Sequence, residues 1–161
     1  MLFEEEAARI REVARGLGHY RIEHFGSTAI PMLAAKPIID IMIIAPQVSQ
    51  WPQLIQPIES LGYLHWAENP RQDRMFFVKG MPPLGTGRTH HVHVRSPNDS
   101  ENELLFRDYL RSQPDEALRY GALKHALAAR FPTDRDAYGD AKAQFVAGVI
   151  AKARANVGDA F

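Results

Sequence analysis

The sequence has 161 residues, no cysteine, and nineteen basic residues that balance nineteen acidic ones. The lack of cysteine excludes a disulfide scaffold and thiolate chemistry, and the zero formal charge excludes the broad positive field of a general nucleic-acid-binding protein, although a local basic groove is still compatible with it. No apolar run approaches the roughly 20 residues of a membrane span, and the charged start is unlike a signal peptide, so we expect one cytoplasmic domain over residues 1–161.

A helix and a strand are the first predicted elements. Apolar residues recur at helical spacing over Phe3–Leu17, and Gly18 is a suitable end for that helix. Alternation over Tyr20–Phe25 then predicts a strand. Glu23 and His24 are neighbours in this strand, so they lie on opposite sides of it, and at most one of them can join a site on a given face.

The next segment contains the residues around which we expect the chain to be organised. A Gly26-Ser27-Thr28 turn follows the first strand, and one of its hydroxyls is suited to cap a short helix over Ala29–Ala35, which Pro31 limits. A second strand, preceded by Lys36-Pro37, has the near-continuous apolar character of a strand buried on both faces. Asp40 lies within it, where ionisation is costly unless a cation, a metal or a hydrogen-bonding network meets the carboxylate, or Asp40 lies at the open end of the strand.

The sequence pattern in the middle of the chain predicts one interrupted helix and three strands. A helix over Ala45–Leu61 contains Pro57, which costs about 3 kcal/mol inside a helix, so a kink or two short pieces are expected. In the last strand, alternation places His91 and His93 on one face, together with Thr89 and Arg95. The three strands are expected over residues 62–66, 75–79 and 88–95.

Three helices are predicted after the strands, because apolar residues recur there at three-to-four spacing. They are expected over residues 98–111, 114–131 and 134–156. No linker-like stretch separates them from the front of the chain. The expected fold class is therefore α/β (α+β), with an α/β half of about five strands over residues 1–96 and a helical half over residues 97–161.

The first chemical constellation is Gly26-Ser27, followed after twelve residues by Asp40. A strand, a Gly-Ser turn and a helix leave backbone N–H groups and a hydroxyl facing outward, which is a suitable cradle for phosphate. The second strand then brings a carboxylate to the same edge, and a carboxylate-held Mg²⁺ with a phosphate grip is the minimum for nucleotidyl or phosphoryl transfer. The structural alternative is that the glycine turns the chain, the serine caps a helix, and Asp40 pairs with Lys36 or a backbone amide.

The stretch RIEHFGSTAIPMLAAKPIIDIMI resembles the signature of the GrpB family, in which a His-x-Gly-Ser-Thr turn precedes a Lys-Pro-Ile-Ile-Asp-Ile strand. The HHVHVR strand and the FRDYL segment of the helical half also fit, so the resemblance covers nearly the whole chain. The family is similar to a module fused behind dephospho-CoA kinase in some bacteria, and it belongs to the nucleotidyltransferase-like superfamily. The resemblance implies a mixed sheet with helices packed on it and a site edge where Gly26, Ser27 and Asp40 meet, but it assigns no reaction.

Met42 departs from the superfamily pattern, in which this strand carries two acidic residues one apart. Methionine is a poor ligand for a hard cation, so ordinary two-metal chemistry is not expected. The third acid of the pattern falls on the strand that here carries His91 and His93. We therefore hypothesise that Asp40, His91 and His93 hold one divalent metal ion (Mg²⁺, Mn²⁺ or Zn²⁺), and imidazole ligands favour Zn²⁺, Mn²⁺, Fe²⁺ or Ni²⁺ over Mg²⁺. The alternative is that the imidazoles hydrogen-bond within a polar sheet face or, when protonated, bind phosphate.

These observations predict a GrpB-type nucleotidyltransferase-like protein that binds a nucleotide or another phosphorylated small molecule. If the protein is an enzyme, the expected reaction is metal-dependent nucleotidyl transfer to an unassigned acceptor, with Asp40 as the catalytic residue. The alternatives are a non-catalytic nucleotide- or phosphometabolite-binding module without the second acid, and a domain whose helical half docks a partner protein. The residues expected to contact substrate are Gly26, Ser27, Thr28, Lys36 and Arg88.

Overall fold

A computed structural model describes residues 2–33 and 36–159 of the chain. The chain divides into two compact units: Met1–Ala29 with Ala35–Glu101, and Ile30–Ala34 with Asn102–Phe161. Every residue that the sequence predicts to bind metal or substrate belongs to the first unit. The site can therefore be described within that unit alone.

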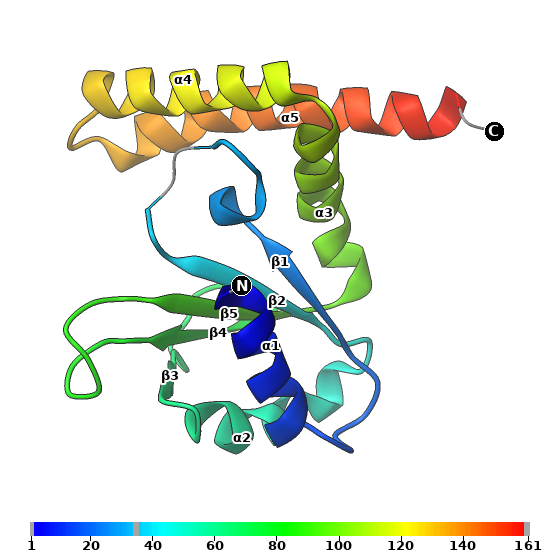
Figure 1. The fold of residues 1–161 in the computed structure, drawn as a ribbon, viewed down its shortest axis with the longest axis vertical. Helices are drawn as coiled ribbons and strands as arrows, with labels where there is room; N and C mark the ends of the chain where they lie inside the picture. The colour runs from blue at the N-terminus through cyan, green and yellow to red at the C-terminus, as the bar shows by residue number, and fades with distance from the viewer. Residues whose placement is uncertain (1, 34–35, 160–161) are drawn as a thin grey trace. The chain divides into compact units, whose positions relative to one another are not determined.

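A five-stranded mixed sheet is the frame of the first unit, as expected from the sequence (Figure 1). The strand order is β1-β2-β5-β4-β3, in which β2 and β5 are parallel and the other neighbours are antiparallel. The strands that carry Asp40 and the two histidines are therefore adjacent, and neither is an edge strand. The strands are β1 (Arg21–Phe25), β2 (Ile39–Ile44), β3 (Tyr63–His65), β4 (Arg74–Lys79) and β5 (His90–Arg95).

One face of the sheet carries the apolar core of this unit. Helix α1 (Leu2–Val13), the 3-10 helix η2 (Val48–Leu54) and helix α2 (Ile55–Glu59) pack on that face. The helix expected over 45–61 is indeed two short pieces, and Pro57 lies in the first turn of α2, where its missing N–H is not needed. The core combines β-branched strand residues with helical side chains: Ile39, Ile41, Ile43, Val92, Val94, Ile10, Trp51 and Ile58.

The opposite face carries polar side chains in rows across the strands, because paired residues point to the same face and side chains alternate along each strand. The first row is Phe25, Asp40, His91 and Val78. The second row is Glu23, Met42, His93 and Phe76. The third row is Arg21, Ile44, Arg95 and Arg74.

The prediction of a short helix over Ala29–Ala35 is wrong for those of its residues that the structure describes. A single 3-10 turn, η1 (Ser27–Ala29), follows β1, and Met32 then adopts a left-handed φ of 64°. Pro31 explains the early end, because it lacks a backbone N–H and disfavours helical geometry in the residue before it. Residues 34 and 35 of the expected helix lie outside the described residues.

Glu6 ties α1 to two strands of the sheet. Its carboxylate is buried and accepts hydrogen bonds from the Tyr63 hydroxyl (2.9 Å) and the Lys79 amine (2.7 Å). Burial alone raises the pKa of Glu6, but these hydrogen bonds and the Lys79 charge outweigh burial, so the pKa lies below its ordinary value. Tyr63 and Lys79 lie 57 and 73 positions after Glu6 in the sequence, so helical spacing does not reveal these two contacts.

The described part of the second unit is mainly helical. Its helices are α3 (Pro97–Ser112), which begins in the first unit, α4 (Pro114–Arg130) and α5 (Arg135–Asp159). Pro114 is the first residue of α4, a position that proline favours. None of the described helices combines the length and apolarity that crossing a membrane requires. The core of the unit contains Ile30, Leu110, Ala117, Tyr120 and Val149.

Candidate functional site

Asp40 lies on β2 with one carboxylate oxygen close to both imidazoles of β5. Its Oδ1 is 3.1 Å from Nδ1 of His91, which donates a hydrogen bond to it, and 3.8 Å from Nε2 of His93. One ligand atom from each of the three side chains lies within 4.8 Å of the others. The parallel register of β2 and β5 produces this cluster, because it pairs Asp40 directly with His91.

Aromatic rings hold the two imidazoles in place. The ring centroid of Phe76 is 5.1 Å from that of His91 and 4.8 Å from that of His93. On the other side, Phe25 meets His93 edge-on at 5.1 Å. These contacts restrict the rotation of both imidazoles and shield them from water. Sequence reasoning missed both phenylalanines as site residues, although the alternation of β4 places Phe76 on the face opposite the buried Phe77.

The environment of Asp40 favours its ionised form. Burial raises the pKa of Asp40, but the hydrogen bonds and charges of His91 and His93 outweigh burial and lower the pKa to about 2. Burial lowers the pKa of His93, although Asp40 partly opposes this effect. Near neutral pH the site therefore holds a carboxylate beside a neutral His93. One ring nitrogen of a neutral imidazole is unprotonated, and its lone pair can bind a metal ion.

The three side chains fit a small divalent ion. Two nitrogens bound to Zn²⁺ at 2.0–2.1 Å in tetrahedral geometry lie roughly 3.4 Å apart. The distances from Asp40 Oδ1 to the two imidazoles, 3.1 and 3.8 Å, bracket that separation. The other two ring nitrogens, Nε2 of His91 and Nδ1 of His93, are buried without a hydrogen-bond partner in the part of the chain that the structure describes, and they are not the nitrogens near Asp40 Oδ1. Two imidazoles and one carboxylate are a donor set that suits Zn²⁺ or Mn²⁺ better than Mg²⁺.

The glycine turn lies directly against Asp40. Gly26 has a left-handed φ of 74°, and a Cβ atom at this position would lie 2.7 Å from Asp40 Oδ2. Glycine is therefore needed here both for the backbone conformation and for the close approach of the carboxylate. The structure brings Gly26 and Asp40 together, as the resemblance implied.

The phosphate cradle is smaller than the sequence predicts. Because η1 is a single 3-10 turn, it lacks the dipole of a full helix. The amide of Ala29 already donates to the carbonyl of Gly26 (3.1 Å), and the Thr28 hydroxyl is 3.0 Å from Nε2 of His24. The Ala29 amide and the Thr28 hydroxyl are therefore already engaged within the first unit.

Lys36 and Arg88 are exposed cations just before two adjacent strands. Lys36 precedes β2 and Arg88 precedes β5, so both enter the sheet at the edge where Asp40 and His91 pair. Both side chains are long and flexible enough to reach a phosphate placed at that edge. Their role in binding substrate stays a prediction.

The two neighbours on β1 lie as alternation predicts, on opposite faces. Glu23 pairs with Met42 and therefore shares the face of Asp40, and its carboxylate is 3.1 Å from Nε of Arg21. His24 instead lies on the face that α1 covers, where its ring stacks on Phe3 at 4.7 Å. Glu23 is thus the member of this pair that lies on the face of the site, one row away from Asp40.

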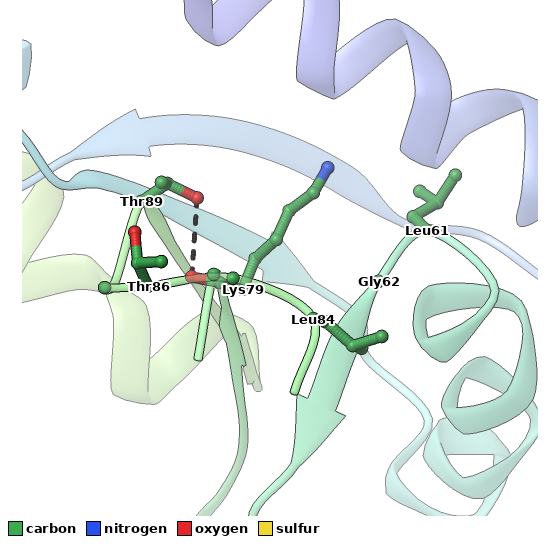
Figure 2. Close-up of a pocket in the computed structure, with 9 residues that line it drawn as sticks. Leu61, Gly62, Lys79, Leu84, Thr86 and Thr89 are labelled. Atoms are coloured by element: carbon green, nitrogen blue, oxygen red, sulfur yellow. Dashed lines mark hydrogen bonds between the residues drawn. The ribbon is translucent and has the colours of Figure 1, made fainter. Parts of the chain in front are cut away.

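A hollow beside the β4–β5 loop is less suited to an anion. Figure 2 shows Lys79 and Thr89 lining this hollow, whose volume is about 460 Å³. The hydroxyl of Thr89 donates to the carbonyl of Lys79 at 3.4 Å, the dashed contact in Figure 2. The Lys79 amine, however, is the partner of Glu6, so its charge is already neutralised. Among its described lining residues, this hollow therefore offers phosphate no cation that is not already paired.

Acid should remove the stabilisation that Asp40 provides in the metal-free protein. Because folding lowers the pKa of Asp40 from 3.8 to about 2, its ionised form stabilises the fold above about pH 4, and this effect is lost as the pH falls toward 2. The shift corresponds to about 2 kcal/mol. We expect the difference in unfolding free energy between wild type and Asp40→Asn to shrink over this range in urea titrations with chelator. A difference that is constant from pH 6 to pH 2.5 would contradict the account.

Several known proteins are similar to this chain in sequence or in fold. Residues 1–152 match the family model described as GrpB protein. UPF0157 protein PA4798 of Pseudomonas aeruginosa is 53% identical over 152 residues, which are 94% of this chain and 62% of that relative, so the chain spans less than two thirds of the relative's length. The conserved protein GrpB from Enterococcus faecalis has a similar crystal structure, with 37% identity and a TM-score of 0.77 over 94% of this chain and 90% of that chain.

A more distant structure shows the same type of fold. Cid1, solved in complex with its short product ApU, is similar over 86% of this chain and 46% of that chain, with 13% identity and a TM-score of 0.55. At this identity the similarity concerns the fold alone. The expected fold class, a nucleotidyltransferase-like mixed α/β fold, is thereby confirmed.

Proposed function

This chain belongs to the GrpB family, and on that basis we propose that it binds a nucleotide or another phosphorylated small molecule where Asp40, His91 and His93 meet. The proposal includes a divalent metal ion held by these three side chains and metal-dependent nucleotidyl transfer to an unassigned acceptor. The observation that carries it is the convergence of three metal-ligating side chains from two strands beside a glycine turn.

Each residue has a distinct task in this proposal. Asp40 is ionised near neutral pH, so it supplies negative charge, and the neutral His93 supplies a lone pair. A divalent ion in this site would act as a Lewis acid toward a phosphoryl oxygen. Lys36 and Arg88 would neutralise the remaining phosphate charge, and the Ser27 hydroxyl would donate a hydrogen bond to it.

Replacing Asp40 by asparagine should weaken metal binding at least about 100-fold, because it removes the only negatively charged member of the cluster. Calorimetric titration of the chelator-treated protein with Mn²⁺ and Zn²⁺ at pH 7.5 measures this loss. His93→Gln should behave similarly. His19→Gln is the control, since it removes an exposed imidazole that is not part of the cluster.

The site proposal fails if wild type binds neither ion more tightly than millimolar, or if His19→Gln loses as much affinity as His93→Gln. The first result would leave the hydrogen-bonded Asp40–His91 pair as a structural feature of the sheet. The second would assign the observed binding to exposed imidazoles in general.

Met42 favours a second candidate function, a non-catalytic binding module. It is fully buried at the position of the superfamily's second acid, where it pairs with Glu23 and His93. A thioether does not ligate a hard cation, so the second metal position of a two-metal enzyme is missing here. ATP titrations, with Mn²⁺ and with EDTA, separate the candidates. Binding that needs both metal and Asp40 favours the transferase, whereas binding in EDTA that survives Asp40→Asn favours the module.

A further inference from the structure

A pocket lies on the face of the sheet opposite Asp40 and His91, where α1 meets the first residues of β2 and β5. Its volume is about 780 Å³, within the roughly 300–1,000 Å³ of small-molecule sites. Ile39 and His90, which pair across β2 and β5, line it from the sheet. Leu2, Phe3 and Glu4 line it from α1. All of these residues belong to the first unit.

One wall of this pocket is a pair of stacked rings. Phe3 and His24 lie 4.7 Å apart with only 9° between their planes. Nε2 of His24 also lies 3.0 Å from the Thr28 hydroxyl, which fixes the orientation of the imidazole. A wall made of parallel ring planes favours a flat aromatic ligand over a branched aliphatic one, because rings stack offset at such distances.

The described lining of the pocket carries little charge, which favours an uncharged ring over phosphate. Among the residues that the structure describes, it contains one carboxylate, Glu4, and neither lysine nor arginine. The polar side chains of this lining form two pairs, in which the imidazole of His24 lies 3.0 Å from the Thr28 hydroxyl and that of His90 lies 2.9 Å from the Thr89 hydroxyl. Apolar walls with a few such groups suit the ring of a nucleobase.

The pocket and the metal-ligating cluster lie on opposite faces of the sheet, and the glycine turn adjoins both of them. Gly26 lies against Asp40, whereas Thr28, two residues later, lines the pocket. Similarly, Ile39 and His90 in the pocket precede Asp40 and His91 in the chain, and consecutive strand residues point to opposite faces. A ligand that crosses the edge of the sheet at this turn would therefore meet both sites.

From this arrangement we infer that the pocket binds the planar heteroaromatic ring of a nucleoside, as the ring subsite of the ligand whose phosphates reach Asp40. The connection to phosphate rests on the proposed function, but the binding of the ring does not. A nucleoside without phosphate should therefore bind in the absence of metal. Inorganic tripolyphosphate with Mn²⁺ should bind through Asp40 and be indifferent to changes in the pocket.

The test titrates the chelator-treated protein with adenosine and uridine, by calorimetry and by saturation-transfer NMR. Phe3→Leu removes the stacked ring but keeps an apolar side chain, and it should weaken nucleoside binding at least about tenfold. Glu4→Trp places a bulky side chain at the exposed rim and should block the pocket without changing the packing of the core. Trp66→Leu is the control, because Trp66 is an exposed aromatic residue outside the pocket, where nonspecific stacking would occur.

The inference is overturned if neither nucleoside binds at millimolar concentration, or if Trp66→Leu weakens binding while Glu4→Trp does not. Circular dichroism checks that Phe3→Leu is folded, and Glu4→Trp decides the question if it is not. If tripolyphosphate with Mn²⁺ fails to bind while adenosine binds, the proposed function fails and the ring pocket stands. If only tripolyphosphate binds, the pocket fails and the proposed function stands.

Discussion

Replacing Glu6 by alanine is expected to lower the free energy of unfolding by about 3–5 kcal/mol, because a buried ion pair loses one partner. The Lys79 amine, 2.7 Å from the carboxylate on a side chain that is 21% exposed, would remain in the protein without its counter-charge. The Tyr63 hydroxyl would lose its acceptor as well. Urea denaturation followed by circular dichroism at pH 7 measures the change.

Glu5→Ala is the matched control for this prediction. Glu5 occupies the same turn of α1 but is exposed, so its loss should change stability by less than about 0.5 kcal/mol. The pKa of Glu6 lies below its ordinary value of 4.5, so its stabilising effect is present above that pH and is lost as the pH falls through the lowered value. The gap between wild type and Glu6→Ala should therefore narrow in acid. Equal effects of the two alanine variants would show that the buried contact contributes nothing.

Gly26→Ala should have the second large effect, on both stability and metal binding. The added methyl would lie 2.7 Å from Asp40 Oδ2, so the carboxylate must move away from the position where it meets the imidazoles. We expect Mn²⁺ affinity to fall at least about tenfold, since displacement of a ligand weakens a site even when all ligands are present. Calorimetry measures affinity, and urea denaturation measures stability.

Gly16→Ala separates crowding from backbone strain. Gly16 has a comparable φ of 80°, but a Cβ there meets no atom within 4 Å. Its substitution should cost about 1–2 kcal/mol through left-handed strain and leave metal affinity unchanged. If Gly16→Ala weakens Mn²⁺ binding as much as Gly26→Ala does, the effect is general destabilisation, and the close contact with Asp40 is irrelevant.

Local pattern predicted the elements well because the relevant physics is local. Alternation assigned His91 and His93 to one face and separated Glu23 from His24, since side-chain direction in a strand depends on position parity alone. The effect of Pro57 on the helix over 45–61 was also predictable, because the missing N–H is a property of that residue. The helix over 29–35 was mispredicted where the chain turns at Pro31 and Met32.

Several contacts had no signal in the sequence. The burial of Glu6 depends on Lys79 and Tyr63, which reach it from other strands. The contact of Phe76 with both imidazoles depends on the antiparallel pairing of β4 with β5. Neither set of contacts can be predicted from the spacing of residues in the sequence, because strand register is set by packing over whole strands and by loop geometry.

By itself, the sequence determined which side chains share a strand face, where the glycine turn falls, and the family to which the chain belongs. Only the tertiary structure decided that Asp40 and His91, 51 residues apart, lie side by side. That outcome follows from the parallel pairing of β2 with β5, whose free energy is distributed over all the paired residues and the core beneath them. A shift of the register by one residue would have turned the imidazoles toward the apolar core.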